Sequence, residues 1–227
     1  DPDTAPIPPA ALERLEELAY RTKFANAACH RTLAELLDAF EQERVPVLVL
    51  KGAALSLWLY PDPALRPFGD IDLLIPRDQL DEARAILEHR GLDLSLERGE
   101  NFSFEFLKGM NYTRAGTQSI SVDLHWHLLS PTYYRRTVPI EWFWQQTTTF
   151  LCNGRTARTL NPEAQLLYLS AHATLHHTRV RLMLLYDIGR LLTAENAAWD
   201  WERVVADAER FGLAPALALT LQRTVKW

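Results

Sequence analysis

The spacing of hydrophobic and polar residues changes along the chain and predicts alternating helices and strands in its first part. Residues 9–43 carry apolar positions at helical spacing, and the β-branched run at 45–50 predicts a short buried strand. A helical pattern returns over residues 52–60. The run DIDLLI (70–75) predicts a second strand, and the amphipathic pattern at 77–91 predicts another helix.

The middle of the chain alternates apolar with polar residues, as half-buried strands do. This pattern covers residues 92–97, 102–113 and 119–128, and AGTQ at 115–118 has the composition of a hairpin connection. Strands and helices in this order, followed by a meander of strands, are typical of an α/β (α+β) fold with a mixed β-sheet flanked by helices.

The last part of the chain has a mainly helical pattern. A short helix is expected at 139–146 and a small β segment at 147–160, and Asn161 and Pro162 are typical of the start of the next helix. Further helices are expected over 161–177, 178–195, 200–212 and the residues after 212. These patterns divide the chain into N-terminal helices (1–45), a core region (46–135) and a C-terminal helical subdomain (136–227).

Composition and charge narrow the class of protein. Of 227 residues, 48% are hydrophobic and 23% are charged, which is ordinary for a globular chain with its own core. The net charge is −5 and no Lys/Arg-rich stretch occurs, so binding to an extended nucleic acid is not favoured. Cys29 and Cys152 form no metal or disulfide pattern. Without a signal-peptide pattern or an apolar run long enough to span a membrane, the expected location is the cytoplasm.

Two carboxylates mark the start of the second strand. Asp70 and Asp72 are two residues apart, so they point to the same side of a strand, where their charges repel. A third, Asp123, lies within the apolar run at 119–128, which we expect to pair with the strand of Asp70 and Asp72. Three converging carboxylates favour Mg²⁺ or Mn²⁺, because these hard cations prefer oxygen ligands.

The first predicted strand ends in a turn suited to phosphate. Lys51 and Gly52 stand where the strand passes directly into a helix. Glycine allows close approach of the backbone, and the helix N-terminus offers unpaired amides to an anion. Lys51 adds a positive charge, and Arg66 in the following loop is a second potential phosphate contact.

Three segments together resemble a known family. LKGAAL, RPFGDIDLLI and VDLHWHLL are similar to segments of the bacterial uncharacterised nucleotidyltransferase family, part of the DNA polymerase β-like nucleotidyltransferase superfamily. The resemblance implies transfer of a nucleoside monophosphate from ATP or another NTP to a hydroxyl-bearing acceptor, a small molecule or a protein, with release of pyrophosphate. It implies that Asp70, Asp72 and Asp123 bind the metal and act in catalysis. The superfamily's usual Ser after the Gly is Ala53 here, so Lys51, the backbone amides or Ser56 would take over its phosphate contact.

Histidines leave a second interpretation open. Asp123, His125 and His127 alternate on one predicted strand and could together bind zinc, or His125 could lie near the phosphates or the acceptor. His172 and His176 share a helix face and could pair on a metal, although a place in the core or facing the cleft is favoured for these two and for His177.

Charged residues of the predicted C-terminal helices have a simpler interpretation. Asp187 interrupts an apolar face and is expected to pair with an arginine. Arg179, Arg181 and Arg190 are expected to be solvated or paired rather than to contact a triphosphate.

Two rival functions follow from these alternatives. One is a metal-dependent hydrolase that uses the histidines. The other is a catalytically inactive binding module that keeps the fold, for which the missing Ser at position 53 is the main support. The sequence indicates neither the acceptor, the preferred NTP nor the oligomeric state.

Overall fold

A five-stranded mixed sheet forms the centre of the computed structural model, which describes residues 7–95, 109–116, 119–129, 131–176, 181–194 and 199–226. The first half of the chain contains α1 (Pro9–Gln42), β1 (Leu48–Leu50), α2 (Lys51–Trp58), β2 (Asp70–Leu74), α3 (Leu80–His89), β3 (Asp93–Leu94), β4 (Gly109–Arg114) and β5 (Ile120–His125). The second half contains α4 (Thr132–Thr137), α5 (Ile140–Gln145), β6 (Thr147–Cys152), β7 (Arg155–Leu160), α6 (Pro162–Leu175), α7 (Leu182–Leu192), α8 (Trp201–Arg210) and α9 (Ala214–Thr224). Short 3₁₀ helices, η1 (Pro63–Leu65) and η2 (Arg77–Gln79), precede β2 and α3.

The strand order of the sheet is β1-β2-β5-β4-β3. Only the β2–β5 pair is parallel, and the other neighbours are antiparallel. The predicted mixed sheet is therefore confirmed, as is the pairing of the strand that carries Asp123 with the strand that carries Asp70 and Asp72. The predicted strand at 102–113 is described only from Gly109, and residues 117–118 of the predicted hairpin connection lie outside the described residues.

The two faces of the sheet belong to different hydrophobic clusters. Ile71 and Leu73 of β2 pack with residues of α1 and α3, whereas Leu74 packs in the cluster that includes α6 and α7. Because side chains alternate along a strand, Asp70 and Asp72 lie on the same side of β2 as Leu74. The two carboxylates consequently face the helices of the second half of the chain.

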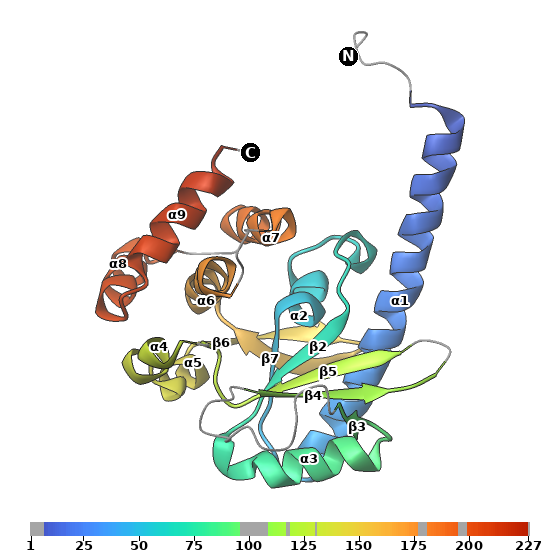
Figure 1. Cartoon of the computed structure of the whole chain (residues 1–227), viewed down its shortest axis with the longest axis horizontal. Coiled ribbons are helices and arrows are strands. Elements are labelled where there is room, and N and C mark those ends of the chain that lie inside the picture. Colours follow the sequence, from blue (N-terminus) through green and yellow to red (C-terminus); the bar gives the residue numbers. More distant parts are fainter. Residues whose placement is uncertain are drawn as a thin grey trace.

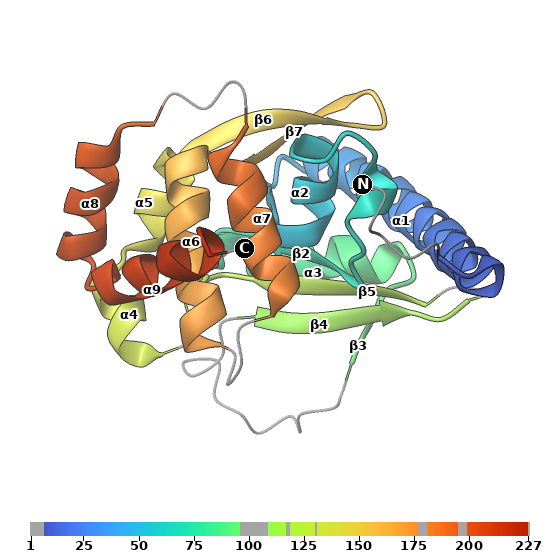
Figure 2. The same cartoon turned by 90° about the horizontal axis from the view of Figure 1, so that it is seen from above.

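Those helices gather on one side of the molecule, with α1 on the other (Figure 1). Helix α6 contacts α7, α8 and α9, and Figure 2 shows the group from above. The hairpin β6–β7 packs against β1 and α2. Its turn consists of Asn153 and Gly154, both with positive φ, as the type I′ turn of a two-residue hairpin requires. The predicted N-cap is confirmed, since Asn161 accepts a hydrogen bond from the amide of Ala164. The pattern did not predict α4.

Helix α1 is continuous over 34 residues, so this region of helical pattern forms one helix and not the predicted several N-terminal helices. Its C-terminal half is packed into the core through residues such as Leu33, Leu36 and Phe40, while its N-terminal half extends past the rest of the molecule (Figure 1). Leu12 and Leu15 on that extension are exposed. Among the described helices, none combines the length and the apolar character that crossing a bilayer would demand.

Candidate active site

The candidate site forms where β1, β2 and β5 lie side by side. Leu50 at the end of β1 pairs with Asp72, and Asp72 pairs in turn with Asp123. Helix α2 begins directly after Leu50, so Lys51 stands beside the carboxylate pair. Lys51 has a φ of +48°, a left-handed conformation that non-glycine residues rarely adopt. This conformation allows the chain to pass from strand to helix without an intervening loop.

Asp72 is the centre of the site. Its side chain is completely buried, and its Oδ1 accepts hydrogen bonds from Lys51 Nζ at 2.5 Å and from His125 Nε2 at 2.8 Å. Burial by itself would raise the pKa of Asp72, but the Lys51 ammonium and the His125 bond outweigh it and lower that pKa well below its ordinary value. Asp72 is therefore ionised at neutral pH. Its Oδ2 is buried and has no hydrogen-bond partner among the described residues.

The other two carboxylates differ from Asp72 and from each other. Asp123 is half-buried and accepts a hydrogen bond from Asn111 Nδ2 at 2.6 Å. Asp70 forms no ion pair with any residue that the structure describes, and burial together with the charges of Asp72 and Asp123 raises its pKa to about 6, although Lys51 partly offsets this. Negative charge is thus concentrated here beyond what Lys51 neutralises, which favours a cation.

The donor set fits a divalent metal ion. One ligand atom each of Asp72, Asp123 and His125 can be chosen so that all three lie within 4.8 Å of one another. The orphaned Oδ2 of Asp72 is a further oxygen without a partner. Two carboxylates with an imidazole suit Mn²⁺, and Mg²⁺ when water completes the shell. Of the predicted metal ligands, Asp72 and Asp123 belong to this compact group, His125 is its third member, and Asp70 as a ligand stays a prediction.

Two of the predicted phosphate contacts are engaged elsewhere. Ser56 is completely buried and its Oγ lies 3.0 Å from His30 Nε2, so its hydroxyl already has a hydrogen-bond partner. Arg66 is buried in a bidentate pair with Asp187. The predicted pairing of Asp187 with an arginine is confirmed. The charge of Arg66 is therefore already paired with a carboxylate.

The geometry does not support a zinc site formed by Asp123, His125 and His127. Strand β5 ends at His125, and His127 lies beyond it, where its Nδ1 accepts a hydrogen bond from the amide of Leu129. Burial, followed by the charge of Arg135, lowers the pKa of His127 to about 4. His127 is not part of the metal-binding group.

Helix α6 contributes a residue that the sequence pattern did not indicate. Tyr168 is buried, and the charge of Lys51 acts on its hydroxyl, although burial outweighs that charge and raises the pKa of Tyr168. The rings of His172 and His176 follow at successive turns, with centroids 6.0 Å from Tyr168 to His172 and 4.9 Å between the histidines. The four-residue spacing of the three aromatic rings in the sequence is the signal that could have identified Tyr168. His177 and Arg179 lie outside the described residues, and Arg190 donates to the carbonyl of Leu59.

Asn111 is the second missed residue. It pairs in register with Asp123 across β4 and β5 and donates to both Asp123 and Ser121. Gly109 on the same strand leaves room for the ring of His125, because a Cβ atom there would lie 2.6 Å from His125 Nδ1. A polar residue and a glycine inside a predicted strand were the only signals, and their meaning depends on the register.

Gly52 has a packing role in addition to the predicted phosphate role. A Cβ atom at this position would clash with the Cβ of Phe68 and lie 2.7 Å from Nη1 of Arg66.

Gly52→Ala is therefore expected to lower the free energy of unfolding by about 1–3 kcal/mol, because an added methyl group overpacks this contact. Urea denaturation measures the loss. Gly69→Ala is the matched control, because a Cβ atom at Gly69 meets nothing within 4 Å. Equal stability of the two variants would contradict this role.

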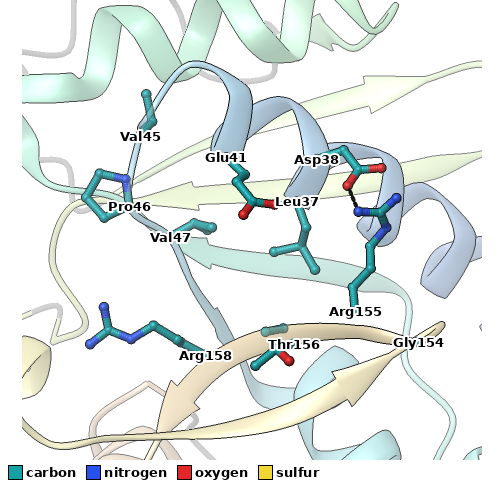
Figure 3. Close-up of a pocket in the computed structure, with 11 residues that line it drawn as sticks. Leu37, Asp38, Glu41, Val45, Pro46, Val47, Gly154, Arg155, Thr156 and Arg158 are labelled. Atoms are coloured by element: carbon teal, nitrogen blue, oxygen red, sulfur yellow. Dashed lines mark ion pairs between the residues drawn. The ribbon is translucent and has the colours of Figure 1, made fainter.

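A separate hollow lies at the other end of β1. It has a volume of about 500 Å³, and Figure 3 shows it between the end of α1, the residues before β1 and the β6–β7 turn. Asp38 and Arg155 form an ion pair on its wall (Figure 3). None of the residues predicted for the active site lines this hollow.

The sequence matches a family model over almost its whole length. The model of the family described as uncharacterised nucleotidyltransferase matches residues 2–227, so the chain belongs to this family and is a nucleotidyltransferase. The family predicted from the three sequence segments is confirmed. Curated proteins offer no significant match.

Solved structures with a similar fold include an antibiotic-resistance factor, ANT(2'')-Ia. Its solution structure aligns with a TM-score of 0.53 and 15% sequence identity, over 88% of this chain and 95% of that one. A crystal structure of ANT(2'')-Ia in complex with adenylyl-2''-tobramycin aligns with a TM-score of 0.52 and 16% identity, over 82% of this chain and 97% of that one. At these identities the similarity establishes a shared fold.

Proposed function

We propose that this protein transfers a nucleoside monophosphate from an NTP to a hydroxyl group of a small molecule or a protein, with Mg²⁺ or Mn²⁺ as cofactor. The observation that carries the proposal is the convergence of Asp72, Asp123 and His125 within 4.8 Å, directly beside the β1–α2 turn with Lys51. A cation site next to a helix N-terminus and a lysine has the charges that a metal-bound triphosphate requires.

Each residue of the site has a distinct part in this reaction. Asp72, Asp123 and His125 would hold the metal ion, and Asp70 adds negative charge beside them. The amides at the start of α2 and the Lys51 ammonium would bind the β- and γ-phosphates. When bound, the metal ion would offset the negative charge that develops on the phosphates and orient them.

The bonds made and broken are those of an in-line displacement. The acceptor oxygen forms a bond to the α-phosphorus, the bond from that phosphorus to the bridging oxygen breaks, and pyrophosphate leaves. Asp123 would take the proton of the acceptor hydroxyl, since it is half-buried and its Oδ1 accepts a hydrogen bond from the neutral amide of Asn111 rather than from a cation. The complex of ANT(2'')-Ia with adenylyl-2''-tobramycin is consistent with a small-molecule acceptor for this fold.

Calorimetric titration tests the proposal without knowledge of the acceptor. ATP, GTP, CTP and UTP are titrated, each with and without Mg²⁺, into the wild type and the Asp70→Ala/Asp72→Ala variant. We expect at least one NTP to bind the wild type only in the presence of Mg²⁺, and this binding to be lost in the variant. The exposed Asp78→Ala serves as control and should bind like the wild type. If no NTP binds the wild type, a nucleotide site at these carboxylates is excluded and the binding-module interpretation gains weight.

The same titration should depend on pH. The pKa of Asp70 is about 6 in the metal-free protein, so Asp70 is largely protonated at pH 5 and ionised at pH 7.5. Metal binding favours the ionised form, and Mg²⁺-dependent NTP binding should therefore strengthen as the pH rises through 6. Asp70→Asn lacks this charge at both values and should lose the part of the pH dependence that Asp70 causes. An unchanged pH profile in Asp70→Asn would show that Asp70 does not interact with the bound metal.

A further inference from the structure

Lys51 holds the same carboxylate that the metal ion would need. We propose that Lys51 is an exchangeable counter-cation: it neutralises Asp72 in the metal-free protein and moves to the triphosphate when metal and nucleotide arrive together. Metal binding then depends on the nucleotide. This inference rests on the proposed function and specifies how the same site is regulated.

The contacts of Lys51 are those of a resident cation. Its Nζ lies 2.5 Å from Asp72 Oδ1, and the exposed fractions of the two side chains are 16% and 0%. Asp70 and Asp123 add negative charge nearby. Buried carboxylates without a counter-charge are costly, so a cation must be present before any metal ion binds. Among the described residues, Lys51 is the one cationic side chain other than a histidine that forms an ion pair with Asp72.

Lys51 and a metal ion cannot share Asp72 without penalty. Both are cations, and in a buried site their mutual repulsion is only weakly screened. A metal ion that binds Asp72 and Asp123 must therefore displace the Lys51 ammonium, or else bind with lower affinity because the ammonium repels it. Displacement alone would leave the ammonium without its ion-pair partner Asp72 in a largely buried place.

A triphosphate removes this penalty. Lysine is a point charge on a flexible four-carbon stem, and Lys51 stands at the N-terminus of α2, where phosphate oxygens are expected to bind. The ammonium can exchange the Asp72 carboxylate for a phosphate without leaving the site. Metal ion and NTP thus bind cooperatively, and each increases the affinity of the other by the same factor.

Titration of Mn²⁺ followed by electron paramagnetic resonance measures this coupling directly. Mn²⁺ is titrated into the wild type, Lys51→Met and Lys51→Arg, alone and with a non-hydrolysable α,β-methylene analogue of the NTP that binds best. We expect Lys51→Met to bind Mn²⁺ alone about tenfold tighter than the wild type, and the affinity gain caused by the analogue to shrink by a similar factor. Lys51→Arg keeps the charge and should not bind Mn²⁺ alone more tightly than the wild type. Lys23→Met, which removes an exposed lysine of α1, is the matched control and should behave like the wild type.

Thermal unfolding separates this role from a merely structural one. Without metal, Lys51→Met should melt at a lower temperature than the wild type, and Mn²⁺ alone should raise its melting temperature by more than it raises that of the wild type. If Lys51→Met does not fold, Lys51→Gly replaces it, because glycine adopts the φ of +48° without strain and the backbone amides remain.

The possible failures can be told apart. If the wild type binds Mn²⁺ and nucleotide together, but removal of the ammonium leaves the affinity for Mn²⁺ alone unchanged or weaker, the counter-cation role is overturned and the proposed function stands. If the wild type binds neither Mn²⁺ nor nucleotide in any combination, both are overturned.

Discussion

Replacing Asp72 by asparagine is expected to reduce nucleotidyl transfer by at least about 10³-fold, the largest effect of any single substitution on activity. Asparagine has nearly the same shape but lacks the charge. The substitution removes a carboxylate that accepts hydrogen bonds from both Lys51 and His125 and that also belongs to the candidate metal-binding group. The metal ion would lose an anionic ligand, and Lys51 would lose its ion-pair partner.

The measurement is the Mg²⁺-dependent release of pyrophosphate from NTP, with a panel of hydroxyl-bearing small molecules as acceptors. Asp78→Asn is the control, since Asp78 is exposed on η2 and lies outside the metal-binding group. Circular dichroism must show that the Asp72→Asn variant retains its helices, so that loss of activity is not loss of fold. Activity of Asp72→Asn within tenfold of the wild type would exclude Asp72 as an essential metal ligand.

Replacing Asp187 by alanine should have the largest effect on stability, a loss of about 3–5 kcal/mol in the free energy of unfolding. Asp187 is completely buried in α7. It accepts hydrogen bonds from Arg66 Nε at 3.2 Å, from Arg66 Nη2 at 2.7 Å and from the Tyr60 hydroxyl at 2.6 Å. Its removal would leave the Arg66 guanidinium buried and unpaired, and the desolvation cost of that charge would no longer be compensated.

Urea denaturation monitored by tryptophan fluorescence measures this loss. Asp81→Ala is the matched control, because the Asp81 side chain is 93% exposed and its ion pair with Arg84 is long, at 3.7 Å. Removal of Asp81 should therefore change the free energy of unfolding by less than about 0.5 kcal/mol. The double variant Arg66→Met/Asp187→Leu should recover much of the stability, since hydrophobic side chains of similar volume can replace a buried ion pair. A loss below about 1 kcal/mol in Asp187→Ala would show that the pair does not stabilise the fold.

The Asp187 pair also connects stability to the site. Arg66 belongs to the loop that leads into Asp70, and its partner Asp187 belongs to helix α7. Gly52 of α2 packs against Arg66 and Phe68, two residues of this loop. The position of the loop before β2 is thus determined by a helix more than a hundred residues later in the chain.

Much of the fold followed from local pattern. The apolar runs at 45–50 and 70–75 predicted the strands around residues 48 and 70. Helical spacing predicted the helix from residue 9, and Asn161 with Pro162 predicted the start of the helix at 162. The two-residue spacing of Asp70 and Asp72 was sufficient to place both on one side of β2. The three sequence segments were also sufficient to identify the nucleotidyltransferase family, which the family model confirms.

The composition of the site required the tertiary structure. The parallel register of β2 and β5 sets Asp72 opposite Asp123, and His125 joins the candidate metal-binding group through its hydrogen bond to Asp72. Asn111 reaches Asp123 through the register of β4, which depends on residues far away in the sequence. Register is a non-local property, and hydrophobic spacing within a strand does not specify it.

Local sequence pattern was sufficient to predict most of the elements in their order, the family and a group of carboxylates on paired strands, since these follow mainly from residues close together in the chain. Which charges meet depends instead on how distant elements pack. This packing paired Lys51 with Asp72, enclosed Ser56 against His30 and assigned Arg66 to Asp187. Each of these choices follows from burial, because a polar group removed from water must find its partner among whichever residues the packing of distant elements brings within reach.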